Sequence, residues 1–141
     1  MNHYEFPQRF RALYDQAVAH YAAGRRGADT FFTPEERRYL ADNGLSAQNL
    51  YDYAEDHHGY GGDPGPENAL AIELVRRDYF LNVQGGRAST AVIDPAGMPA
   101  KADAVRGIAW LPRLIPKARA KLRGELPPSL MYCCGGERAF F

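Results

Sequence analysis

Hydrophobic residues recur at helical spacing near the start of the chain. Between positions 7 and 23 they are Phe10, Leu13, Tyr14, Ala17, Val18 and Tyr21. Steps of three and four residues place such side chains on one side of a helix. Pro7 suits the first turn and Gly24 suits the position just after the last turn. The pattern predicts an amphipathic helix over 7–23.

Two capping signals predict a pair of short helices next. Thr33, Pro34 and Glu36 have the spacing of a capping box with proline in the first turn. After Asn-Gly at 43–44, Ser46 is the expected cap of a second helix, with Leu45 and Leu50 spaced as a hydrophobic staple. The region 33–56 therefore predicts two helices joined by a short turn.

The middle of the chain leaves two alternatives open. Residues 59–66 hold four glycines and two prolines, which predicts a loop. From 66 to 84 the apolar spacing favours a long helix that ends at Gly85 and Gly86. The alternative for 79–93 is a short β-hairpin with its turn at these two glycines. Residues 86–100 are expected to be irregular.

The last helix is predicted over 111–123. Its apolar residues lie within about 100° of one another, which predicts that they face the core: Leu111, Leu114, Ile115, Ala118 and Leu122. The basic residues occupy the remaining arc and are expected to point outward: Arg113, Lys117, Arg119, Lys121 and Arg123. Pro116 removes one helical hydrogen bond, so the regular part is expected to start near Ile115.

Length and composition complete the expected fold. A chain of 141 residues suits a single domain over 1–141. Hydrophobic residues make up 45% of it and charged residues 24%, which excludes a disordered chain. We expect a mostly α-helical compact bundle of about five helices with irregular connections rich in glycine and proline. No stretch reaches the ~20 apolar residues of a membrane span and no leader follows Met1, so neither a membrane partner nor export is expected and the compartment is expected to be cytoplasmic.

Charge is balanced overall but unevenly distributed. Seventeen basic residues match seventeen acidic ones. The segment 28–73 holds ten acids and two bases, a net charge of −8, whereas 101–124 holds seven bases and one acid, a net charge of +6. The two segments either pair with each other, or the basic segment presents an anion-binding face. Both alternatives stay open at this point.

The run from Gly107 to Leu126 resembles a bacterial family of unknown function. Its Leu-Pro-Arg at 111–113, Lys-Ala-Arg at 117–119, Gly124 and Tyr132-Cys133-Cys134 follow the pattern of domain-of-unknown-function family 5069. The resemblance covers about the last third of the chain. Because the activity of that family is unknown, the resemblance implies no substrate, cofactor or catalytic residue.

The two cysteines, Cys133 and Cys134, are adjacent. Their Cα atoms lie about 3.8 Å apart, below the usual range for a disulfide. A structural zinc site needs about four ligands at set spacing, and the only complement is the distant group Asp56, His57 and His58. We therefore expect no metal site and no cofactor. A reactive thiol next to Arg138 is the remaining functional interpretation of this pair.

The function favoured by these observations is a non-catalytic binding module that recognises an anionic small ligand or an acidic protein surface through the basic helix. The candidate binding residues are Arg113, Lys117, Arg119, Lys121, Trp110 and Arg76. The alternative is a small thiol-dependent enzyme, or a redox or metal-binding protein, that uses Cys133 and Cys134. Contact with RNA or DNA through the same helix is a third hypothesis, and the neutral charge balance argues against it. The ligand and the oligomeric state do not follow from the sequence.

Overall fold

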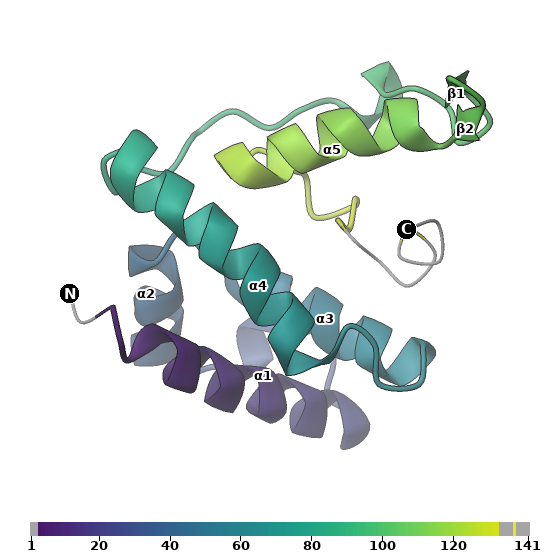
Figure 1. Ribbon diagram of the computed structural model, residues 1–141. Coiled ribbons are helices and arrows are strands. Elements are labelled where there is room, and N and C mark those ends of the chain that lie inside the picture. Colours follow the sequence, from purple (N-terminus) through teal and green to yellow (C-terminus); the bar gives the residue numbers. More distant parts are fainter. Residues whose placement is uncertain (1–2, 133–136, 138–141) are drawn as a thin grey trace.

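Five α-helices make up most of the computed structural model, which describes residues 3–132 and residue 137 (Figure 1). They are α1 (Phe6–Ala22), α2 (Pro34–Asp42), α3 (Ala47–Gly59), α4 (Gly65–Asp78) and α5 (Leu111–Arg123). Shorter elements are the 3₁₀ turns η1 (Ala28–Thr30) and η3 (Pro95–Gly97), the π-helical turn η2 (Tyr79–Val83), and the strands β1 (Ala104–Val105) and β2 (Ile108–Ala109). The strands pair antiparallel, with Ala104 opposite Ala109. No helix of the described ranges has the length and apolar character needed to cross a membrane. The expected mostly α-helical fold is confirmed.

The predicted helix starts are confirmed by their caps. The Thr33 hydroxyl accepts from the backbone N–H of Glu36, and the Glu36 carboxylate accepts from the backbone N–H of Thr33 at 2.8 Å. Ser46 caps α3 in the same reciprocal way with Asn49 as its partner. Each reciprocal pair satisfies two backbone N–H groups that the helix itself leaves without acceptors.

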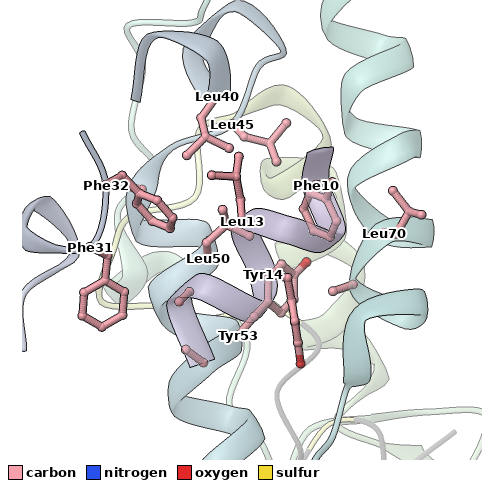
Figure 2. Packing of buried hydrophobic residues seen from close by; sticks show 14 of the residues in the cluster. Phe10, Leu13, Tyr14, Phe31, Phe32, Leu40, Leu45, Leu50, Tyr53 and Leu70 are labelled. Atoms are coloured by element: carbon pink, nitrogen blue, oxygen red, sulfur yellow. The ribbon is translucent and has the colours of Figure 1, made fainter. Parts of the chain in front are cut away.

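The apolar core lies where α1, α3 and α4 meet (Figure 2). All of its fully buried members fall between Phe6 and Leu70. Phe10 and Leu50 are both 0% exposed, and Tyr14 packs its ring against that of Tyr53 with 6.3 Å between ring centroids. The predicted staple residues Leu45 and Leu50 are both buried here. This core fixes α3 and α4, the helices that carry Asp52 and Arg76 of the candidate site.

The segment after α4 decides between the helix and the β-hairpin that the sequence left open for 79–93. Residues 79–83 continue the helix as a π turn, so the hairpin considered for 79–93 is wrong, and the short antiparallel pair lies at 104–109 instead. Phe80 is buried and its ring lies over Gly44, where an added Cβ would come within 2.5 Å of the ring. Gly44 also has a φ of +79°, a conformation that favours glycine. The two features together hold the end of α4 against the turn between α2 and α3.

The last helix, α5, packs against α4 and η2, outside the main apolar cluster (Figure 1). It begins at Leu111, not near Ile115, and the N–H groups of Arg113 and Leu114 both bond the carbonyl of Trp110. The single donor missing at Pro116 therefore does not delay the helix. The start itself is unusual, because Trp110 has a φ of +71°.

The orientation of α5 corrects the predicted outward face. Lys117 is buried at 5% exposure, and the side chain of Lys121 is only 12% exposed. Conversely Ile115, predicted to face the core, is 41% exposed. Arg119 does point outward. The physical reason is that buried carboxylates of the same chain, Glu137 and Glu73, pair with Lys117 and Lys121 and replace the water that the two ammonium groups lose.

Candidate functional site

A cavity of about 250 Å³ lies between α3, the end of α4, the end of α5 and the segment that follows α5. The pockets that hold drug-sized ligands usually measure roughly 300–1,000 Å³, so this one suits a small molecule. Its charged lining residues are Asp52, Arg76 and Lys121, one from each of the three helices. Tyr132 and apolar residues of 126–131 form the opposite wall. The charged groups make this cavity the candidate site.

Arg76 stands in the last turn of α4 and is 4% exposed. Its Nη1 donates to Oε1 of Gln84 at 2.8 Å, and its guanidinium carbon lies 5.3 Å from the centroid of the Phe80 ring. No described carboxylate forms an ion pair with it. Burial lowers the pKa of Arg76, and the negative charge of Glu73 opposes that shift. A guanidinium stays charged even so, which leaves a buried cation with donors to spare.

Gly124 makes room for this guanidinium. It ends α5 with a φ of +70°, and a Cβ built on it would lie 2.5 Å from Nη2 of Arg76. Gln84 completes the arrangement, because its amide nitrogen donates to the carbonyl of Arg123 at 3.0 Å. Arg76 is therefore held between the end of α4 and the end of α5.

Glu73 organises the inner side of the site from α4. It is 0% exposed, and its Oε1 accepts from the Tyr53 hydroxyl at 2.7 Å and from the Lys121 ammonium at 2.5 Å. Its Oε2 is buried with no hydrogen-bond partner among the described residues. The Lys121 ammonium also lies 5.9 Å from the centroid of the Tyr53 ring. Lys121 is thus paired with Glu73, whereas Arg76 feels the charge of Glu73 but forms no ion pair with a described carboxylate.

Asp52 lines the same cavity from α3 and is half-buried. Its Oδ1 accepts from Nε2 of Gln48 at 2.7 Å. The pKa of Asp52 is raised to about 6, above all by burial, while the hydrogen bond from Gln48 and the charge of Lys121 act against the rise and the repulsion of Glu55 and Asp56 adds to it. A carboxyl group in a cavity with a pKa this close to neutrality is a common feature of binding and catalytic sites.

The structure brings together three of the residues predicted for binding, because Arg76, Arg119 and Lys121 line an open hollow of about 470 Å³ between α4 and α5, and two of them also line the smaller cavity. Arg76 and Lys121 line the cavity. Lys117 instead forms a buried ion pair with Glu137, and Nη1 of Arg113 donates to the carbonyl of Pro99 at 2.8 Å. Trp110 lies at the start of α5 with the Lys101 ammonium 5.2 Å from its ring centroid. Lys117 and Arg113 are therefore occupied within the chain, whereas Arg119 is exposed and lines the larger hollow beside Arg76 and Lys121. Ligand binding by these residues stays a prediction.

The structure bears on the two interpretations of the uneven charge distribution. Lys121 and Glu73 link the basic segment 101–124 to the acidic segment 28–73, as the ion-pairing alternative predicts. Arg76, outside the basic segment, is buried and forms no ion pair with a described carboxylate, although the charge of Glu73 acts on it. The ion-pairing alternative therefore holds for Lys121, and anion binding stays a prediction.

Sequence reasoning missed Asp52, Tyr53, Glu73 and Gly124. A signal for Glu73 does exist, because positions 69, 70, 73, 76 and 77 fall on one side of a helix and two of them are apolar. That spacing indicates that Glu73, Arg76 and Arg77 are drawn inward with Ala69 and Leu70, and all five are buried. Asp52 carries no comparable signal, since it stands among other acids on a helix that looks solvated.

The thiol prediction cannot be placed in the structure, because Cys133 and Cys134 lie outside the described residues. In the ranges that are described, no group of three or more histidine, cysteine, aspartate or glutamate side chains is arranged to hold a metal ion. The chain matches no protein-family model, no curated protein and no solved structure. The resemblance of 107–126 to the family of unknown function thus stays a prediction, and the function is argued from the site alone.

Proposed function

We propose that the protein is a non-catalytic binding module that holds a small ligand by its anionic group in the cavity between α3, α4 and α5. Arg76 is the principal contact and Lys121 the second. The observation that carries the proposal is the position of Arg76, a guanidinium that is 4% exposed, lines a cavity and has no ion-pair partner among the described residues.

The energetics support this assignment. A buried charge without a counter-charge is costly, and an anion that enters the cavity would offset that cost. One donor of Arg76 is used by Gln84, and the remaining guanidinium donors suit the paired oxygens of a carboxylate or a phosphate. Lys121 adds a second positive charge near the same space, although Glu73 holds it from behind.

The alternative with a thiol-dependent reaction at Cys133 and Cys134 remains a separate prediction. No described contact favours it. Localisation to the cytoplasm likewise remains an expectation from the sequence.

Binding of simple anions tests the proposal. We expect inorganic phosphate or sulfate to raise the Tm in a saturable way, since a ligand that binds only the folded state stabilises it. Arg76→Met keeps the unbranched stem and removes the charge, and it should weaken anion binding at least tenfold. Arg38→Met, on the exposed face of α2, is the matched control and should bind like the parent protein.

A third variant separates the cavity from the outer face of α5. Arg119→Met should leave binding unchanged, because Arg119 lines the open hollow beside Arg76 and Lys121 and not the cavity itself. If Arg119→Met abolishes binding and Arg76→Met does not, the ligand sits on the outer face and the cavity assignment is wrong. If neither phosphate, sulfate nor succinate raises the Tm of the parent protein, the proposal fails. Should Arg76→Met not fold, Arg76→Lys keeps the charge without the planar fork, and weaker binding by that variant is the expected result.

A further inference from the structure

The cavity that holds Arg76 and Lys121 is also lined by a negative charge. Among the described residues around it, Asp52 is the one acid. It comes from α3, whereas the two cations come from α4 and α5. A cavity with charge of both signs does not suit a simple anion well, because Asp52 repels any negative group that comes near it.

Asp52 has capacity to bind a donor. Gln48 donates to its Oδ1, and no described residue donates to its Oδ2. The charged groups that act on it are Glu55 and Asp56 on its own helix and Lys121 on α5. Two of these three repel its negative charge, and the third is already bound to Glu73. The protein itself therefore compensates the ionised carboxylate of Asp52 only in part.

We infer that the ligand is zwitterionic: its anionic group pairs with Arg76, and an amine on the same molecule pairs with the carboxylate of Asp52. This inference rests on the proposed function and adds the ligand class to it. An ammonium is favoured over a neutral donor because charge-assisted hydrogen bonds are about twice as strong as neutral ones. A cavity of about 250 Å³ restricts the ligand to the size of an amino acid or a similar aminocarboxylate or aminosulfonate.

Because the pKa of Asp52 is raised, the inference predicts how ligand binding changes with pH. Burial first of all raises that pKa, to about 6. An amine-bearing ligand should lower it again, because a cation favours the charged carboxylate, whereas a simple anion should raise it. Binding of a zwitterion should therefore weaken as the pH falls from 7.5 to 5.5, and binding of sulfate should strengthen over the same range.

Matched pairs of probes, with and without the amine, test the inference. The pairs are β-alanine and propionate, glutamate and glutarate, and 2-aminoethanesulfonate and ethanesulfonate, titrated at pH 7.5 against the whole protein and followed by amide NMR shifts. In at least one pair the amine-bearing member should bind at least tenfold more tightly. Asp52→Asn should remove that preference while sulfate binding is retained, because the substitution keeps the shape and the acceptor for Gln48.

A second measurement does not depend on a variant. The carboxyl carbon of Asp52 is titrated by NMR with and without the tightest amine-bearing probe, and its pKa should fall when the probe is bound. An unchanged or higher pKa contradicts the inference. If sulfate binds through Arg76 but no pair shows a preference for the amine, or if the preference survives in Asp52→Asn, the zwitterion inference is wrong and the anion-binding function stands. If no probe and no simple anion binds, the zwitterion inference and the proposed anion-binding function are both wrong.

Discussion

Glu73 illustrates how much a single residue determines in this protein. It lies on the inner side of α4, fully buried, with two donors on one carboxylate oxygen. Buried carboxylates are tolerated where a cation and hydrogen bonds replace water, and the Lys121 ammonium and the Tyr53 hydroxyl do so here. The residue therefore fixes the position of α5 relative to α3 as well as the charge behind the cavity.

Asp52 has a predictable effect on stability. Its pKa is higher in the folded state than the ordinary value of about 4, so between about pH 4 and pH 6 the folded state binds more protons than the unfolded state. Ionisation of Asp52 therefore lowers the free energy of unfolding as the pH rises through this window. Asp52→Asn should be more stable than the parent at pH 7, by about 1 kcal/mol after allowance for solvent screening, and nearly equal to it at pH 4.

Urea unfolding at a series of pH values measures this difference. The exposed Asp15→Asn variant serves as the control and should follow the parent curve. A stability difference for Asp52→Asn that is independent of pH would argue against a raised pKa at this position.

At the scale of the elements, the caps are the features with the clearest local cause. The Thr33 hydroxyl and the Glu36 carboxylate each accept one backbone N–H at the start of α2. This helix has only nine residues, and isolated helices shorter than about 12 residues are marginal in water, so its start contributes a large share of its stability. Ser46 and Asn49 form the same reciprocal cap at the start of α3, which has 13 residues.

Removal of the first cap should be measurable. Thr33→Ala should lower the free energy of unfolding by about 1 kcal/mol, because the N–H of Glu36 loses its side-chain acceptor. The measurement is chemical unfolding followed by circular dichroism. Thr90→Ala changes an exposed threonine outside any helix and should have almost no effect. Equal losses in the two variants would show that the cap is not the cause.

These elements also show what the sequence can and cannot predict. Caps and apolar spacing are local, so the starts of α2 and α3 and the extent of α1 are predictable from nearby residues. The orientation of α5 is not local, because it depends on Glu73 and Glu137, which are distant in sequence. A helix that carries both an apolar and a basic stripe can bury the basic one when the interior of the protein supplies carboxylates. The cavity depends on that orientation. The sequence therefore identified Arg76 and Lys121 as separate candidates but did not predict that they line the same cavity.

At the scale of the whole molecule, α5 is joined to the rest by polar contacts more than by the apolar core. Besides the ion pair of Lys121 with Glu73, Gln84 donates to the carbonyl of Arg123, and the N–H of Ile93 donates to the carbonyl of Glu125 at 3.0 Å. The fully buried members of the apolar cluster all belong to the first seventy residues. The structure therefore has an apolar body to which α5 is attached by ion pairs and hydrogen bonds as well as by its own buried Leu114 and Ala120.

Gly124→Ala should loosen that attachment. The alanine Cβ would meet Nη2 of Arg76, in addition to the cost of about 1–2 kcal/mol for a left-handed alanine. Gly86→Ala is the matched control, because Gly86 has the same φ of +70° and open space around it. We expect Gly124→Ala to be the less stable variant, by up to about 1 kcal/mol, because the Arg76 guanidinium that it meets is held by Gln84 and has to shift. Amide hydrogen exchange should accelerate in α5 more than in α1, and equal stability of the two variants would contradict the contact.

The π turn at Tyr79–Val83 determines which side chain reaches the end of α5. A π turn takes up one residue more than an α-helical turn. If the same residues were wound as an ordinary α-helix, every residue after the turn would move by about 100° around the axis. Gln84 would then no longer lie between Arg76 and the carbonyl of Arg123. The wider winding of this one turn therefore lets a single amide connect the ends of two helices.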